Sequence, residues 1–235
     1  MKELITADKC YVQDTCKKFH NGECNYLNDP FCIRLYKMDN LYDLSLLTDT
    51  QRKNINLYLD KDHTDEEEYT QLQQYKNNII DFVDSGSNLY IYSSMTGNGK
   101  TSWTLKFIQS YVQKIWPSSD LTCRALFINV PKYTRELKLH IDKKSDYICH
   151  VNEYVESADL VVWDDIATKH TTPYEHEQLL ALLESRLDDK KCNIFTSNIP
   201  PSELTTYLGS RLSSRITGNS IQIEFKGKDK RGFVE

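Results

Sequence analysis

The stretch that decides the fold is Ser94-Met95-Thr96-Gly97-Asn98-Gly99-Lys100-Thr101-Ser102. It follows an apolar run that ends at Tyr92 and precedes a helix-like segment that reaches Trp116. A strand, a glycine-rich loop and a helix in this order are typical of a phosphate-binding loop, because backbone N–H groups and the positive end of the helix dipole face the phosphates. We therefore expect a nucleotide site at this loop.

Each residue type of the loop suits a part of this chemistry. The two glycines let the backbone approach phosphate closely, the Lys100 ammonium reaches the β and γ phosphates, and the Thr101 hydroxyl is a magnesium ligand. Ser94 stands where the usual pattern has its first glycine, and a chance glycine turn is the alternative interpretation of this segment alone. The predicted nucleotide-binding residues are Thr96, Gly97, Asn98, Gly99, Lys100, Thr101 and Ser102.

Composition bounds the kind of protein. The 235 residues suit one sizeable domain with a small appendage, and a hydrophobic content of 39% is enough for a buried core. No apolar run approaches the roughly 20 residues that span a bilayer, and the N-terminus lacks the apolar stretch of a signal peptide. We expect a cytoplasmic protein without a membrane partner. Because the net charge is −5, any surface for nucleic acid must be local.

Strand and helix signals alternate from residue 88 onward. Short apolar strands separated by helices predict an α/β fold with a largely parallel sheet covered on both faces. Strands are expected at Asn88–Ser93, Ala125–Val130, Asp159–Asp165, Cys192–Ser197 and Ile221–Phe225. Helices are expected at Lys100–Trp116, Pro131–Ile141, Val151–Glu156, Glu175–Asp188 and Ser202–Ser214.

Three parts are expected along the chain. Residues 1–40 form a loop-rich, cysteine-rich module, residues 41–84 a linker and helix leading into the core, and residues 85–235 the core domain. Within the linker, the six carboxylates between Asp60 and Glu68 are interpreted as a solvated helix start, before a helix over residues 69–84.

Acidic and amide side chains follow two of the predicted strands. One apolar strand ends in Asp164-Asp165, and a magnesium nucleotidase needs such a pair: Asp164 holds magnesium together with Thr101, while Asp165 orients and deprotonates the attacking water. Asn198 follows another strand, where its amide reaches the water or the γ-phosphate. The alternatives are a solvated strand end for the acids and a turn-forming asparagine before Ile199.

Two arginines, Arg211 and Arg215, lie four residues apart and therefore on one face of a predicted helix. An arginine that reaches the charge of the transition state, often from a neighbouring subunit, complements a single loop lysine. Structural salt bridges are the alternative for both arginines.

Together these motifs resemble those of the AAA+ ATPases of the bacterial and phage replicative helicase loader family, the DnaC/DnaI type. Asp164-Asp165-Ile166-Ala167 is similar to that family's D-D-I-G segment, with Ala167 in place of glycine. Thr196-Ser197-Asn198 resembles its sensor-I segment, and Arg211 to Arg215 its arginine-finger box. The resemblance covers about residues 40–235. It implies a P-loop AAA+ fold with a five-stranded parallel sheet flanked by helices, and without the C-terminal helical lid of longer AAA+ proteins.

Carried over position by position, the resemblance implies that the loop binds ATP and magnesium, that the two acids serve as Walker B, and that Asn198 is sensor I. Arg215, supported by Arg211, is implied to be a finger that acts on a neighbouring subunit. The catalytic residues implied in this way are Lys100, Asp164, Asp165, Asn198, Arg211 and Arg215.

Members of the resembled family carry a helical insertion that lines a groove for single-stranded DNA, near the position of Pro131–Lys138 in this chain. Here and at Lys143-Lys144, basic residues together with the aromatic Tyr133 suit phosphate contact and base stacking. An ordinary amphipathic helix with solvated lysines is the alternative.

Four of the seven cysteines, Cys10, Cys16, Cys24 and Cys32, crowd the first 32 residues. Four soft ligands in a small module with little core favour a structural zinc ion, for which His20 is able to replace one cysteine. An iron–sulfur cluster and free thiols are the alternatives. Some loaders of the resembled type similarly begin with a zinc module that grips the helicase.

The expected function is that of an ATP-dependent loader of a replicative DNA helicase, of bacterial or phage origin. ATP would bridge Lys100 of one subunit and Arg215 of the next in a homo-oligomer that contacts single-stranded DNA. Two alternatives stay open. One is a transposition ATPase resembling the IstB type, against which the cysteine module argues. The other is an ATP-binding interaction protein that blocks a host's own loader. Departures from the usual motifs at Ser94, Asp165 and Ala167 keep this alternative open.

Overall fold

Five parallel strands form one sheet at the centre of the computed structural model, which describes residues 16–24, 30–59 and 62–230. The strand order is β2-β3-β4-β1-β5. The strands are β1 (Asn88–Tyr92), β2 (Ala125–Asn129), β3 (Leu160–Asp164), β4 (Cys192–Ser197) and β5 (Ile221–Glu224). Each strand ends within one residue of its predicted bounds, so the predicted α/β class is confirmed.

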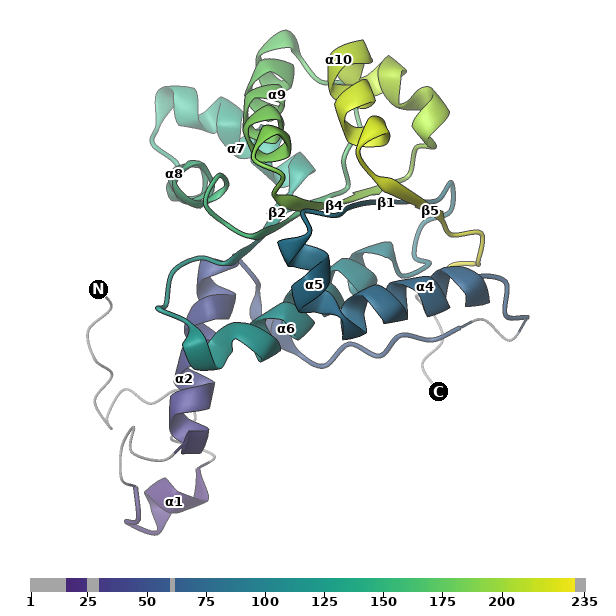
Figure 1. The fold of residues 1–235 in the computed structure, drawn as a ribbon. Helices are drawn as coiled ribbons and strands as arrows, with labels where there is room; N and C mark the ends of the chain where they lie inside the picture. Colours follow the sequence, from purple (N-terminus) through teal and green to yellow (C-terminus); the bar gives the residue numbers. More distant parts are fainter. Residues whose placement is uncertain (1–15, 25–29, 60–61, 231–235) are drawn as a thin grey trace.

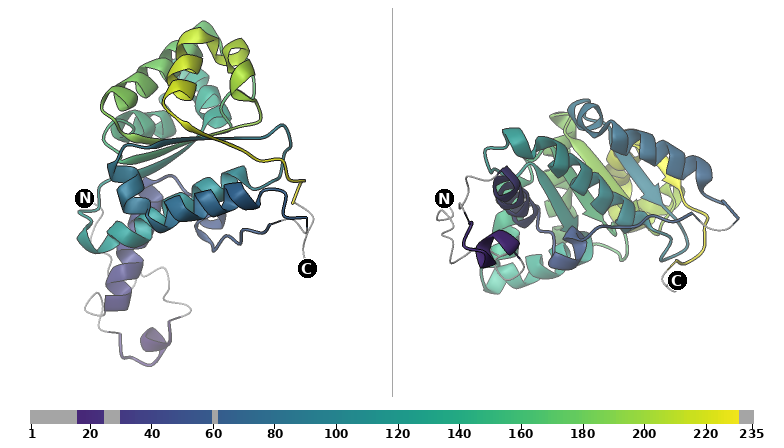
Figure 2. Two further views of the ribbon diagram at one scale, coloured as in Figure 1. Left: turned by 45° about the vertical axis from the view of Figure 1, so that its right-hand side comes forward. Right: turned by 90° about the horizontal axis from the view of Figure 1, so that it is seen from below.

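Helices cover both faces of the sheet (Figure 1), and Figure 2 shows the same layers from two further sides. One face carries α2 (Pro30–Leu44), α4 (Glu66–Asn77), α5 (Ile79–Asp84) and α6 (Lys100–Ile115). The other face carries α7 (Val130–Asp142), α8 (Asp146–Tyr154), α9 (Pro173–Asp188) and α10 (Leu204–Gly218). Short helical turns are α1 (Lys17–His20), α3 (Asp49–Arg52), η3 (Trp116–Ser118) and η4 (Pro201–Glu203). Among the described helices, none combines the length and the apolar character needed to cross a membrane.

Successive residues of the strands β1 to β4 enter different cores, whereas β5 contributes only Ile223. In β1, Leu89 and Ile91 belong to the core shared with α4, α5 and α6, whereas Tyr90 belongs to the core under α7 to α10. In β4, Ile194 and Phe195 divide in the same way. Because both faces of a parallel sheet are covered, its inner strands are largely apolar, and this explains why those strands were visible in the sequence as short apolar runs.

The region before β1 is more helical and more buried than the sequence indicated. α2 crosses from the predicted N-terminal module into the predicted linker. The helix expected over residues 69–84 is two helices, because Asn78 has a non-helical backbone (φ −103°, ψ 38°) between α4 and α5. Asp65, expected in a solvated run, is 1% exposed and accepts a hydrogen bond from the backbone N–H of Gly227. Its burial shows that this part of the run has a structural role.

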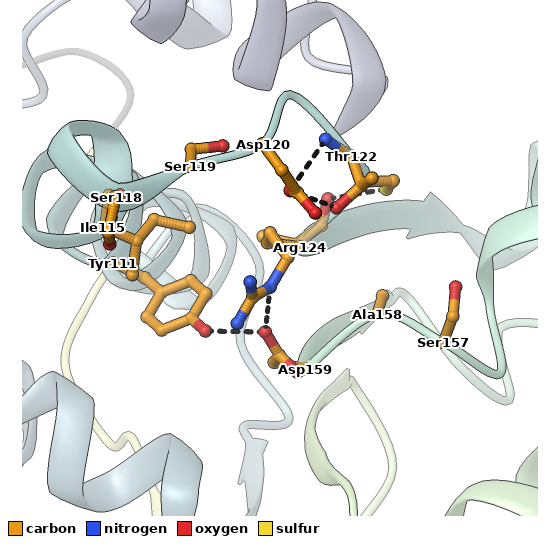
Figure 3. A network of polar contacts seen from close by, with 12 residues as sticks. Tyr111, Ile115, Ser118, Ser119, Asp120, Thr122, Arg124, Ser157, Ala158 and Asp159 are labelled. Carbon is orange, nitrogen blue, oxygen red and sulfur yellow. Dashed lines mark hydrogen bonds and ion pairs between the residues drawn. The ribbon is translucent and has the colours of Figure 1, made fainter.

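Polar contacts join the amino ends of the strands (Figure 3). Asp159, directly before β3, accepts hydrogen bonds from the Tyr111 hydroxyl of α6 at 2.9 Å and from Nε of Arg124, directly before β2. Lys191, directly before β4, adds an ion pair to the same carboxylate at 3.6 Å. One carboxylate therefore ties one helix to the beginnings of three neighbouring strands.

A fully buried arginine reinforces this edge of the sheet. Arg186 of α9 donates through Nε to Oδ1 of Asn193 at 2.7 Å. Its Nη atoms donate to three backbone carbonyls at 2.6–2.7 Å, those of Val155, Ala158 and Cys192. Burial lowers the pKa of Arg186 to about 10. Because the guanidinium is matched by these acceptors, it is tolerated in the core.

One backbone break interrupts α10. Gly209 has φ 73° and ψ 163°, which are not helical. The break separates the first turns of α10 from the segment that carries Arg211 and Arg215. The break therefore affects the direction of the helical segment on which these two arginines lie.

Candidate functional site

The glycine-rich loop connects β1 to α6 at the carboxyl edge of the sheet. Gly97 and Gly99 have positive φ values of 75° and 101°, and Gly99 is the N-cap of α6. A residue with a β-carbon adopts this backbone only at a cost. Lys100 and Thr101 are the first residues of α6, so their backbone N–H groups lie in the first turn, where a helix can bind an anion.

The Lys100 side chain points into the loop. It is 6% exposed, and its ammonium donates to the backbone oxygen of Met95 at 3.0 Å and to Oδ1 of Asn98 at 3.2 Å. Asn98 is itself fixed, because its Nδ2 donates to Oγ of Ser93 at 2.6 Å. The loop thus holds its one lysine inside the curve of its own backbone.

Asp164 is the point at which the motifs meet. It ends β3, and its Oδ1 accepts hydrogen bonds from the hydroxyls of Thr101 and Thr196, both at 2.9 Å. Its Oδ2 accepts from Nδ2 of Asn129 at 3.4 Å. Residues from β2, β3, β4 and α6 therefore converge on one carboxylate, and Thr101 and Asp164 lie close enough to share a metal ion.

The environment of Asp164 opposes its negative charge. Its side chain is buried, and burial raises its pKa above the ordinary value, as does the neighbouring Asp165 carboxylate, while the hydrogen bonds from Thr101, Thr196 and Asn129 lower it. A divalent cation beside the carboxylate would offset both unfavourable effects. The oxygen ligands present are the type that magnesium prefers, so the residues fit this metal.

The loop after β3 has an uncommon backbone. Asp165 and Ala167 have φ values of 59° and 65°, in the left-handed region. The N–H of Asp165 donates to Oγ1 of Thr196 at 2.9 Å, and Oγ of Ser197 donates to the carbonyl of Ile166 at 2.8 Å. The end of β4 therefore holds the two-acid loop in place. Because glycine adopts this conformation without strain, Ala167 occupies a position where glycine would be natural.

The sequence did not reveal two of these contacts. Thr196 and Asn129 touch Asp164 directly. Thr196 stands in the segment that resembles sensor I, without an assigned contact, and Asn129 is marked only as a polar residue at the end of an apolar strand. Asn198, predicted to act at this point, is half-buried and lies one residue beyond β4.

Among the described residues, Arg211 and Arg215 have their contacts with acids of α9 and none with the glycine-rich loop. Arg211 makes two hydrogen bonds of 2.9 Å to the carboxylate of Glu184 on α9. Arg215 lies 3.5 Å from Glu184 and 3.5 Å from Asp188. Both guanidinium groups remain substantially exposed. The two arginines therefore lie on the outer surface formed by α9 and α10.

The sequence from residue 61 to residue 222, well over half of the chain, matches the family described as the bacterial DnaA ATPase domain. The chain belongs to this family. No curated protein matches it significantly.

Solved structures with a similar fold include members of the predicted class. The DnaC helicase loader is similar at a TM-score of 0.61 and 17% identity, over 76% of this chain and 100% of that chain. DnaI is similar at 0.60 and 19%, over 79% and 94%. The replication initiator DnaA bound to AMPPCP and single-stranded DNA is similar at 0.55 and 18%, over 73% and 52%. The predicted AAA+ fold and the resemblance to the DnaC/DnaI type are confirmed.

Helix α7 and the segment after it carry exposed basic side chains, as the sequence predicted, but the predicted role of Tyr133 is wrong. Arg135 and Lys138 have side chains 69% and 55% exposed, and Lys143 and Lys144 are exposed beyond the helix. Tyr133, expected to stack on bases, is instead 0% exposed. It faces the core because it lies on the apolar face of the helix, so it cannot serve as a stacking platform.

The predicted zinc ligands are only partly described. Cys10 lies outside the described residues, and Cys16, Cys24 and Cys32 are half-buried. Within residues 16–24, 30–59 and 62–230, no group of three or more His, Cys, Asp or Glu side chains is arranged to hold a metal ion. Zinc thus stays a prediction from the cysteine spacing alone.

Proposed function

We propose that the chain binds ATP with magnesium at the glycine-rich loop and hydrolyses it. The contact between Thr101 and Asp164 carries this proposal, because it joins oxygen ligands from two motifs 63 residues apart at 2.9 Å. Membership of an ATPase domain family supports it.

Each residue would have a defined task. Lys100 would exchange its contacts with Met95 and Asn98 for phosphate oxygens, while backbone N–H groups at the start of α6 bind the same phosphates. Thr101 and Asp164 would hold magnesium, which supplies positive charge to the phosphate oxygens when bound. Asp165 would take a proton from the attacking water, positioned with the help of Asn198.

Arg215, with Arg211 beside it, would act on the nucleotide of a neighbouring subunit. To do so, Arg215 would exchange its two contacts of 3.5 Å with Glu184 and Asp188 for phosphate oxygens. Contacts of this length between exposed groups are weak, so the exchange has a small energetic cost.

Two substitutions separate binding from turnover. Lys100→Ala should abolish ATP binding, measured by fluorescence anisotropy of a labelled ATP analogue. Arg215→Ala should leave that affinity unchanged and reduce the turnover rate about 10³-fold or more. Normal hydrolysis by Arg215→Ala would remove the finger assignment, and undiminished binding by Lys100→Ala would remove the nucleotide site.

We further propose that this ATPase loads a replicative DNA helicase. The support is the similarity of fold to the DnaC helicase loader, all of whose chain is covered, and to DnaI. A pull-down against a replicative helicase, with and without ATP, tests the partner. Retention of a transposase in place of the helicase would favour the IstB-like alternative.

Single-stranded DNA is the second proposed partner, supported by the exposed basic residues of α7 and the segment that follows it. Removing both charges in Lys143→Ala/Lys144→Ala should weaken binding and reduce its dependence on salt. Lys190→Ala, which removes one lysine charge from the exposed α9–β4 turn, should change neither quantity.

A protein that binds ATP without hydrolysing it is the second candidate. One observation favours it: both arginines are already engaged by acids of their own chain. ATPase assays with and without single-stranded DNA decide the question, because a binding protein would show no turnover under either condition.

A further inference from the structure

Residues 226–230, which we call the strap, follow β5 and contact the glycine-rich loop at Gly97. The strap begins on a buried anchor. The carboxylate of Asp65 accepts hydrogen bonds from the backbone N–H groups of Lys226 at 2.7 Å and Gly227 at 3.0 Å. Asp65 is 1% exposed, so this attachment is part of the core structure.

The other end of the strap is attached to the loop itself. The N–H of Lys230 donates to the backbone oxygen of Gly97 at 2.9 Å. Its ammonium donates to the carbonyl of Tyr58 and the hydroxyl of Tyr69, both at 2.8 Å, and lies 4.6 Å from the Tyr69 ring centroid. The strap therefore spans from the start of α4, across the loop, to the segment before α4.

Between these attachments, the carboxylate of Asp229 lies against Gly97. A β-carbon at position 97 would overlap the carboxylate of Asp229. The positive φ and the missing side chain of Gly97 thus allow two things at once, the curve of the loop and the close approach of an acid.

We propose that Asp229 and the strap restrain nucleotide binding at this loop. The inference rests on the proposed function, since it concerns the phosphates of ATP. A carboxylate beside the loop repels an incoming triphosphate, which carries several negative charges. In this proposal, the contact between Lys230 and Gly97 is lost as the loop encloses the phosphates. The chain would thereby keep a low affinity until a partner or ATP itself displaces the strap.

The expected size of the effect is moderate. Asp229 is exposed, so water and ions screen its charge. We expect Asp229→Asn to bind ATP with magnesium about two- to tenfold more tightly than the native chain at low salt. The gain should shrink at high salt, which a purely structural effect of the substitution would not do.

Three variants compared by anisotropy with a labelled ATP analogue test the proposal. Asp84→Asn is the matched control, because it removes the same charge from an exposed position before β1, at the opposite end of that strand. Its affinity should equal that of the native chain. An affinity of Asp229→Asn equal to or weaker than the native value would overturn the inference. Failure of the native chain to bind, with Lys100→Ala no different, would instead refute the nucleotide site and the restraint with it.

Hydrogen exchange gives an independent readout of the strap's movement. The N–H groups of Lys226, Gly227 and Lys230 are hydrogen-bonded in this structure and should exchange slowly without nucleotide. On addition of ATP and magnesium, the amide of Lys230 should exchange faster, while those held by Asp65 stay protected. Slower exchange at Lys230 would mean that the strap closes over the nucleotide, and would overturn the proposal.

Discussion

At the scale of the residue, Asp164 shows how the proposed site for a cation would affect the protein that carries it. Its carboxylate is buried beside a second acid, and both features raise its pKa. The hydroxyls of Thr101 and Thr196 offset only part of this effect. The ionised form, which the proposed cation would require, is therefore a form that the fold alone disfavours.

The first prediction concerns Asp164→Asn. Without magnesium, this variant should be more stable than the native chain at neutral pH, although it should not hydrolyse ATP. In the native chain, the unfolded state releases its proton at lower pH than the folded state does. Stability is therefore lost as pH rises from the ordinary pKa of an aspartate to the raised one, and the loss is constant above it.

Thermal unfolding of both proteins between pH 3 and pH 8 measures this effect. The advantage of the variant should be absent at the acid end, where the carboxyl is protonated in both states. A lower melting temperature of the variant at pH 7 would contradict the prediction.

Site residues could be predicted from the sequence where they belong to a local motif, and not where their contacts are long-range. Lys100, Thr101 and Asp164 follow local patterns that chemistry requires, and the structure brings them together. Thr196 and Asp229 make contacts with residues distant in sequence, so no local pattern reveals those contacts, although Thr196 stands in the segment that resembles sensor I. The order of the strands and the path of the chain after β5 decide their positions.

At the scale of the element, the break at Gly209 gives α10 two directions. Its φ and ψ fall in a region that is almost restricted to glycine. The second prediction is that Gly209→Ala lowers the free energy of unfolding by about 1–3 kcal/mol. Because the following segment carries Arg211 and Arg215, ATP turnover should fall more than ATP affinity.

Gly218→Ala in the same helix is the control. Its φ is not in the left-handed region, and a β-carbon there would meet no atom within 4 Å. That change should be neutral or stabilising by up to about 1 kcal/mol. Equal effects of the two substitutions in urea denaturation would show that the break at Gly209 is unstrained.

The third prediction concerns the junction formed by Arg186. Arg186→Leu would remove a donor from three backbone carbonyls and from Oδ1 of Asn193, which would keep its contact with Nε1 of Trp163. We expect a loss of about 3–5 kcal/mol in the free energy of unfolding. Arg135→Leu, at a side chain 69% exposed, should change stability by less than about 0.5 kcal/mol. A similarly small effect at Arg186 would contradict the role assigned to it.

Elements were predicted well where their pattern is local. The strands β1 to β4 were found because they are short, largely apolar runs, and β5 was found from its two isoleucines. The break at Asn78 between α4 and α5 was missed, since Leu72 and Phe82 both face the same core and the apolar spacing continues through it. The length of α2 was also missed, because its burial depends on a core that forms with distant segments.

At the scale of the whole molecule, the sheet places the loop on one edge and the arginine-bearing part of α10 on an outer surface. One chain therefore does not bring Arg215 to its own loop. The fourth prediction is that ATP with magnesium promotes self-association, visible as faster sedimentation. Lys100→Ala should remain monomeric at every ATP concentration. A native chain that binds ATP and stays monomeric would contradict the model of a shared site.

The buried Arg186 has a practical consequence for anyone who mutates this chain at random. Substitutions around that guanidinium would prevent the chain from folding, so the variants would be lost from the soluble fraction of a lysate before any assay. Changes around Lys100 or Asp164 would give normal yields of inert material. The yield of soluble protein alone would therefore divide a library of inactive clones into those that no longer fold and those that fold but lack the proposed activity.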